Sequence, residues 1–115
     1  MSIQLTRHTT DFATSPQVKI EEMKEVVSLG FKTLINNRPD GEAADQPTHE
    51  QIKEAAGVFG LHYIFLPVVS SQVGSAAAEF GKQLAAAPKP ALAFCRSGTR
   101  STMLYQTAMA QKPSK

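Results

Sequence analysis

The chain has 115 residues, of which 42% are hydrophobic and 19% are charged, so we expect one folded domain over 1–115. Its formal net charge of +2, with no run of basic residues, argues against a nucleic-acid partner. No apolar stretch approaches the roughly 18 residues that span a bilayer, and residues 1–11 lack the hydrophobic block of a signal peptide. We therefore expect a cytoplasmic protein without membrane contacts, in which the single cysteine stays reduced.

The first part of the chain predicts a strand, a helix and a second strand. Residues 3–12 are suited to a short edge strand, and the proline in Ser15–Gln17 predicts a turn. Apolar residues recur at helical spacing over 18–29, and Gly30 is a suitable residue to end that helix. The β-branched segment 31–36 predicts a buried strand, which runs into the polar loop NRPDGEAADQP.

The rest of the chain continues this alternation. Thr48 is a natural N-cap, and Gln51 completes a capping box for a helix that reaches Phe59. The remaining predicted elements are a strand over 61–67, a helix over 73–86, a strand over 91–94 and a helix over 99–111. We expect the tail at 112–115 to be frayed.

This order predicts an α/β fold: a single domain with a central, mostly parallel sheet of four or five strands and helices on both faces. In open α/β sheets, ligands bind beyond the carboxyl ends of the strands. The segments NNRPDGE and CRSGTRS each follow a predicted strand. We therefore expect the functional site where these two segments meet.

The segment CRSGTRS, residues 95–101, has the composition of an anion-binding loop. A short turn between a strand and a helix directs backbone N–H groups toward an anion, and the helix adds the positive end of its dipole. Gly98 allows a left-handed backbone, and the Arg100 guanidinium is suited to two oxygens of one anion. The predicted anion-binding residues are Arg96, Ser97, Gly98, Thr99 and Arg100.

Cys95 is the predicted nucleophile of this loop. A helix N-terminus and neighbouring cations favour a thiolate, and Ser101 is placed to donate a hydrogen bond to it. The alternative is an ordinary buried cysteine, since free cysteine is among the most buried residue types. We favour the functional interpretation because a core position is seldom followed by so many polar residues.

Two families share features of this loop. A cysteine at the end of a strand, a glycine in the loop and an arginine followed by Ser or Thr resemble the protein tyrosine and dual-specificity phosphatases. Those enzymes place one more residue between cysteine and arginine than the four, 96–99, of this chain. The shorter spacing resembles a single-domain rhodanese, whose cysteine carries a persulfide.

Three further segments favour one bacterial family. The turn SPQ with its helix, the segment GFKTLINNRPDGE and the segment YIFLPVVSSQV resemble the beta-lactamase-hydrolase-like phosphatases, a likeness that covers about Ile3 to Ala110. This resemblance implies a protein-tyrosine-phosphatase-like fold. It also implies that Cys95 attacks a phosphomonoester to form a cysteinyl-phosphate while Arg100 and the loop hold the phosphate oxygens.

The resemblance further implies phosphotyrosine-like or broader phosphomonoester substrates, on a small molecule or a phosphoprotein, and no cofactor or metal. A rhodanese-like sulfurtransferase or persulfide carrier that uses Cys95 is the alternative. A non-catalytic anion-binding domain is a third hypothesis, and the sequence leaves the oligomeric state open.

A general acid is harder to identify. Dual-specificity phosphatases place an Asp shortly after a Y-x-x-x-P strand; Tyr63 and Pro67 fit, but Ser70 stands where the acid is expected. The nearest substitutes are Asp40 and Glu42, of which we predict Asp40, although Pro-Asp-Gly is also a common turn.

Arg38, in the same segment as these carboxylates, either binds anionic substrate or pairs with Asp40 or Glu42. Among the histidines, we expect His62 to be packed in its strand, and His49 and His8 to be solvated. Their spacing supports no metal site, either with one another or with the cysteine.

Overall fold

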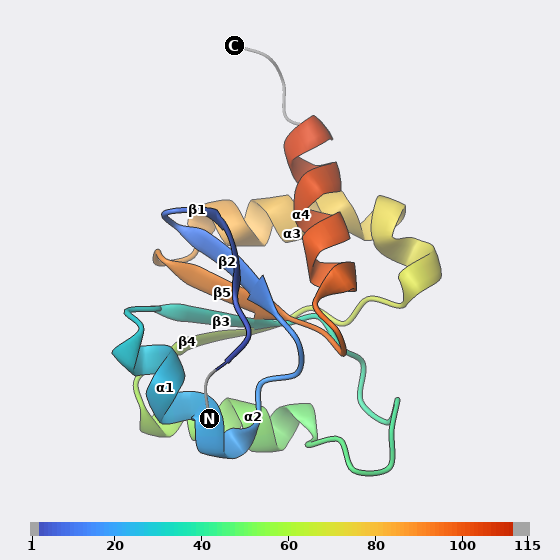
Figure 1. Cartoon of the computed structure of the whole chain (residues 1–115). Coiled ribbons are helices and arrows are strands. Elements are labelled where there is room, and N and C mark those ends of the chain that lie inside the picture. Colours follow the sequence, from blue (N-terminus) through green and yellow to red (C-terminus); the bar gives the residue numbers. More distant parts are fainter. Residues whose placement is uncertain (1–2, 112–115) are drawn as a thin grey trace.

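A five-stranded sheet forms the centre of the computed structural model, which describes residues 3–111 (Figure 1). In spatial order the strands are β1 (Thr6–Thr9), β2 (Phe12–Ser15), β5 (Ala91–Phe94), β3 (Thr33–Asn36) and β4 (His62–Phe65). The last four in this order are mutually parallel, and only β1 pairs antiparallel with its neighbour. This confirms the predicted mostly parallel sheet, while the expected frayed tail lies outside the described residues.

Helices cover both faces of this sheet, as predicted. On one face lie α1 (Met23–Ser28) and α2 (His49–Val58), and on the other lie α3 (Val73–Ala86) and α4 (Thr99–Gln111) (Figure 1). Short 3₁₀ turns at Ile20–Glu22 and Ser70–Gln72 precede α1 and α3. No helix within residues 3–111 is long and apolar enough to cross a membrane.

The N-terminal part differs from the prediction. Residues 3–12 contain β1 and the start of β2, and Ser15, which the sequence placed in a turn, is the last residue of β2. The strand was missed because two of its four residues are polar, although all four are buried between β1 and β5. Tertiary burial therefore overrides a weak local pattern.

The first helix is shorter than predicted. Lys19 has an extended backbone, and its N–H donates to Glu22 Oε1 at 2.8 Å, so the helical turns begin only after it. The strands predicted over 31–36 and 61–67 are also shorter in the structure. The parallel register begins with Thr33 paired to His62 on one side and to Ala91 on the other.

The later elements have the predicted bounds. The helix over 73–86, the strand over 91–94 and the helix over 99–111 are all confirmed. The capping box of α2 is also present: Thr48 Oγ1 accepts from Gln51 N at 3.2 Å, and Gln51 Oε1 accepts from Thr48 N at 2.9 Å.

The central strand β5 separates two apolar cores. Ala91 and Ala93 face the cluster beneath α3 and α4, whereas Leu92 and Phe94 face the cluster beneath α1 and α2. All four residues are fully buried, since both faces of a parallel strand are covered by helices. The first core also includes Phe12, Ile35, Phe80 and Leu104, and the second Val18, Met23, Leu34 and Ile52.

The loop that follows β5 packs against the end of β2. Gly98 has a φ of +95°, and a Cβ added there would lie 3.2 Å from the backbone C and O of Ser15. Gln17 N also donates to Arg96 O at 3.2 Å. Both the conformation and the close approach therefore require glycine at this position.

We predict that Gly98→Ala lowers the free energy of unfolding by about 2 kcal/mol, because a side chain at positive φ is strained and its Cβ meets immovable backbone. Urea unfolding would measure the change. Gly57→Ala is the matched control, since Gly57 lies in α2 with open space around it and should lose nothing. Equal stability of the two variants would contradict the prediction.

Candidate active site

Cys95 directly follows β5 at the carboxyl edge of the sheet and is only 1% exposed. Its Sγ accepts a hydrogen bond from Gly98 N at 3.0 Å, so the loop turns back over the sulfur. The N–H dipole stabilises negative charge on Sγ. The position at the end of a buried central strand holds the sulfur rigidly, as a nucleophile requires.

The other predicted loop residues lie between this sulfur and α4. Arg96 and Ser97 are exposed, and Thr99 is the first residue of α4. Ser97 Oγ donates to Thr99 Oγ1 at 3.2 Å and accepts from Thr99 N at 3.4 Å. The start of a 13-residue helix therefore meets the loop, and its dipole favours an anion there.

The Arg100 guanidinium is anchored by acceptor atoms of two residues from distant parts of the chain. Nη1 donates to Glu42 Oε2 and to Val68 O, both at 2.9 Å, and Nη2 donates to Glu42 Oε1 at 3.1 Å. The side chain is 11% exposed, and its Nε is buried without a partner among the described residues. A buried cationic donor without a partner is costly, and a bound oxyanion would satisfy it.

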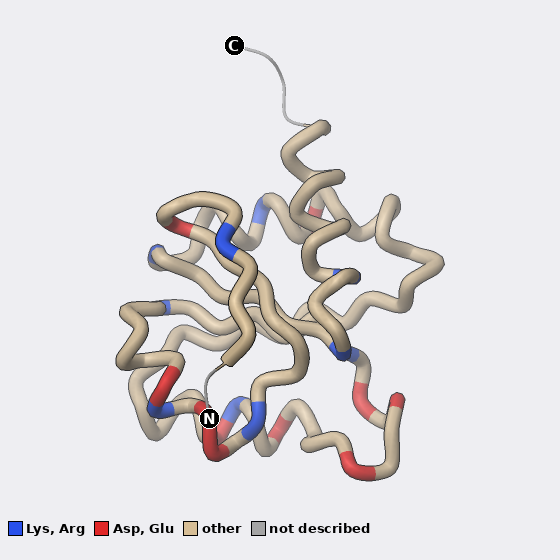
Figure 2. The backbone as a smooth tube through the Cα atoms, viewed as in Figure 1, with Lys and Arg blue, Asp and Glu red and all other residues tan. Residues whose placement is uncertain are grey.

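Glu42 lies between two arginines. Its Oε1 also accepts from Arg38 Nε at 3.1 Å, and Arg38 Nη1 donates to Gln17 Oε1 at 2.9 Å. Figure 2 shows basic positions at the start of α4 close to acidic positions of the loop after β3. Of the two roles considered for Arg38, the structure therefore shows the pairing with Glu42.

These contacts keep Glu42 negatively charged. The hydrogen bond from Arg100 lowers the pKa of the Glu42 carboxyl below its ordinary value, and the hydrogen bond from Arg38 adds to this effect against the opposing effect of burial. Glu42 therefore acts as the anchor of a cation and is not a proton donor near neutral pH.

Asp40, the predicted general acid, lies at the N-terminus of α2. Its Oδ1 accepts from His49 N at 2.7 Å, so the exposed carboxylate caps this helix. Tyr63, part of the Y-x-x-x-P segment, accepts from Asn36 Nδ2 at 3.1 Å, and burial raises the pKa of its hydroxyl to about 12.

The burial of the histidines differs from the expectation. His62 is exposed because it begins the edge strand β4. His49 stacks on Phe65 with ring centroids 3.9 Å apart. His8 packs against aromatic rings of β2 and α4, and burial lowers its pKa. No three His, Cys, Asp or Glu side chains within residues 3–111 are grouped to hold a metal ion.

Ser101 does not donate to the sulfur as the sequence suggested. Its buried hydroxyl donates to Asn37 Oδ1 at 2.8 Å. Sequence reasoning missed Asn37, which is fully buried. The available signal was a pair of asparagines directly after the apolar strand β3, at the edge where the Cys95 loop also lies.

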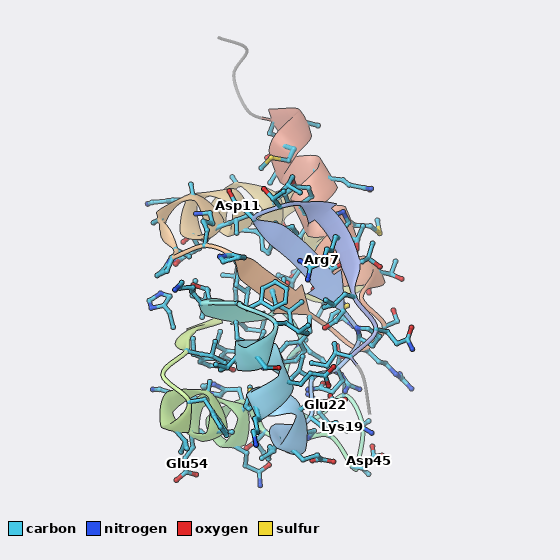
Figure 3. All side chains as sticks on the ribbon, turned by 60° about the vertical axis from the view of Figure 1, so that its left-hand side comes forward. Arg7, Asp11, Lys19, Glu22, Asp45 and Glu54 are labelled. Carbon is cyan, nitrogen blue, oxygen red and sulfur yellow. The ribbon has the colours of Figure 1, made fainter. Side chains whose placement is uncertain are left out.

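A polar hollow of about 470 Å³ lies beside the loop. Its lining includes Arg96 of the loop and Arg38. It also includes the cation Lys19 and the anion Asp45, and Figure 3 labels these two residues at the same end of the molecule. Another hollow of the same volume, between α3 and α4, is mostly apolar and includes no residue of the Cys95 loop. A third hollow, of about 400 Å³, is lined by Ser97, Gly98 and Thr99 of the loop together with the end of β2. The loop therefore borders two hollows, one at Arg96 and one at Gly98.

Known proteins are similar to this chain in sequence and in fold. Residues 4–112 match the family described as the phosphatase-like domain of beta-lactamase hydrolase-like protein. A beta-lactamase hydrolase-like protein of Agrobacterium fabrum is 40% identical over 90 residues, which are 77% of this chain and 21% of that protein. The chain thus spans about a fifth of the length of this curated relative.

Solved structures of other proteins show the same similarity. A candidate phosphatase of Neisseria meningitidis is 34% identical, with a TM-score of 0.77 over 90% of this chain and 75% of that one. TpbA of P. aeruginosa, solved as a C132S variant with phosphotyrosine, shares the fold at 19% identity, with a TM-score of 0.67 over 87% of this chain and 57% of that one. The chain therefore belongs to the family of phosphatase-like domains of beta-lactamase hydrolase-like proteins, as its sequence motifs indicated.

Proposed function

We propose that this domain is a cysteine-dependent phosphatase that hydrolyses phosphomonoesters. The observation that carries the proposal is the Arg100 guanidinium, anchored by Glu42 and Val68 with its buried Nε left without a partner. The same loop holds Cys95 Sγ against Gly98 N. A nucleophile and an unsatisfied cationic donor in one loop suit an ester of phosphate.

The reaction would proceed in two displacements at phosphorus. Cys95 Sγ attacks, an S–P bond forms, and the P–O bond to the leaving group breaks. Water then attacks phosphorus, the S–P bond breaks, and inorganic phosphate leaves. Arg100 and the loop N–H groups would hold the non-bridging oxygens in both steps, and Gly98 N would stabilise the departing thiolate.

Among the described residues, the site offers no evident general acid to protonate the leaving group. Asp40 caps α2, and Glu42 is held ionised between two guanidinium groups. We propose that the domain prefers esters whose leaving group is a weak base, because such a group departs without a general acid. p-Nitrophenyl phosphate is an ester of this kind. Phosphotyrosine, the ligand in the TpbA structure, is a further substrate to test, because its phenolate is a weaker base than an alkoxide.

One observation favours a second candidate, sulfur transfer. The loop has one residue fewer between Cys95 and Arg100 than tyrosine phosphatases have. Sulfur transfer from thiosulfate also needs no general acid, because no alcohol leaving group has to be protonated. Cys95 thiolate would attack the outer sulfur of thiosulfate and release sulfite. Cyanide would then remove the sulfur as thiocyanate and regenerate the thiolate.

We predict that the domain releases p-nitrophenol from p-nitrophenyl phosphate. Cys95→Ser should abolish the reaction, and Arg100→Ala should reduce kcat/KM by about 100-fold or more, because charge stabilisation is lost. Arg7→Ala is the matched control, since Arg7 is an exposed arginine on β1.

The same preparations should be assayed with thiosulfate and cyanide. Thiocyanate formation that depends on Cys95, with phosphate esters left intact, would replace the phosphatase by the sulfurtransferase. If neither reaction occurs while inorganic phosphate still binds, the domain is a non-catalytic anion-binding module.

We predict that Asp40→Asn leaves the rate ratio between p-nitrophenyl phosphate and phenyl phosphate unchanged. The amide oxygen can still accept from His49 N, so the helix cap survives while the acid is removed. Steady-state kinetics on the two esters would test this. A loss of about 100-fold or more on phenyl phosphate alone would instead establish Asp40 as the general acid.

We predict a pH-dependent stability difference between wild type and Glu42→Gln. The pKa of Glu42 is lower in the folded state, so its stabilising contribution is complete above the ordinary carboxyl range and disappears as the pH falls through the folded value. Urea titrations between about pH 7 and pH 3 should therefore show the difference shrinking. Glu54→Gln, an exposed position on α2, should show no such trend.

A further inference from the structure

We infer that Asn37 is a positioning residue that holds Arg100 in its anion-binding orientation. This inference rests on the proposed role of the Cys95 loop and names a residue to which the sequence analysis assigned no role. It is carried by the hydrogen bonds of Asn37, a fully buried polar residue at the carboxyl end of β3.

Asn37 uses its backbone and its side chain to join three segments. Its N–H donates at 2.9 Å to the carbonyl oxygen of Phe94, the residue directly before the cysteine, and its carbonyl accepts from Val68 N at 3.0 Å. In the side chain, Nδ2 donates to Leu66 O at 3.0 Å, and Oδ1 accepts from Ser101 Oγ at 2.8 Å. One residue therefore links the end of β5, the segment after β4 and the start of α4.

The direction of these bonds is determined by chemistry. The Leu66 carbonyl can only accept, so the amide nitrogen of Asn37 must face it and the amide oxygen must face Ser101. Ser101 then has to donate its single hydroxyl hydrogen to Asn37. The orientation of both side chains is thus specified without ambiguity inside a buried environment.

Asn37 contacts both segments that lie next to Arg100. Its backbone carbonyl holds Val68, whose own carbonyl accepts from Arg100 Nη1 at 2.9 Å, and its side-chain Nδ2 holds Leu66, two residues earlier. Its side-chain Oδ1 holds Ser101, the neighbour of Arg100 in the first turn of α4. Loss of the Asn37 side chain would keep the backbone bond to Val68 but release Leu66 and Ser101, so the guanidinium would be held less firmly with its Nε available to an anion.

The experiment compares two reagents at the same sulfur. Iodoacetate is an anion and iodoacetamide is neutral, and both alkylate Cys95 as the thiolate displaces iodide. A correctly placed Arg100 accelerates iodoacetate selectively, so the ratio of the two rate constants reports the local cation, whereas a general loosening of the fold changes both rates. Asn37→Ala should lower this ratio by about tenfold, toward the value of Arg100→Ala.

Binding of inorganic phosphate, measured by calorimetry, should weaken by about tenfold in Asn37→Ala and by a smaller factor in Ser101→Ala. The double variant should bind as Asn37→Ala does, because the two residues act through one hydrogen bond. Thr33→Val is the matched control: Thr33 is a buried residue at the opposite end of β3, where it donates to Pro88 O, and the ratio should stay at its wild-type value.

An unchanged alkylation ratio in Asn37→Ala would overturn the inference. If that variant does not fold, Ser101→Ala decides, since it removes only one hydrogen bond, and a wild-type ratio there would equally overturn it. The alkylation ratio needs no turnover, so failure of the proposed phosphatase activity is distinguishable from failure of the role assigned to Asn37.

Discussion

The burial of β5 on both faces is the constraint on which the rest of this structure depends. Because α1 and α2 cover one face of the sheet and α3 and α4 the other, the strand has no freedom to shift. The residue that follows it, Cys95, therefore projects from a rigid base at the carboxyl edge of the sheet. The loop then turns at Gly98 against the end of β2 and feeds directly into α4. Two well-packed cores thus fix the position of the Cys95 sulfur.

The second organising element is a single carboxylate between two guanidinium groups. Glu42 pairs with Arg100 through both oxygens and with Arg38 through one of them. Bidentate pairs of this kind are strong and directional. The same pairing consumes Nη1 and Nη2 of Arg100 but leaves Nε without a partner in the described part of the chain. The cation is therefore oriented without being fully neutralised.

The site as a whole is better supplied with positive charge than with proton donors. Its nearest carboxylates serve as a helix cap at Asp40 and as an arginine anchor at Glu42. Under the proposed function, this division of roles would suit either an aryl phosphate with a good leaving group or a sulfur donor such as thiosulfate, since both are anions. The two proposed reactions would share the anion-binding geometry and differ in the atom that Cys95 attacks.

The sequence alone determined what is local in this protein. Helical and strand periodicity predicted α3, β5 and α4 with their observed bounds, and the Cys95 loop was recognisable because its residues are contiguous. Only the tertiary structure decided which partners these residues meet. Glu42 and Arg100 are 58 positions apart, and Asn37 and Ser101 are 64 apart, so no local pattern connects them. Parallel strands bring such positions together at one sheet edge, and that meeting depends on strand order, which local propensity does not encode.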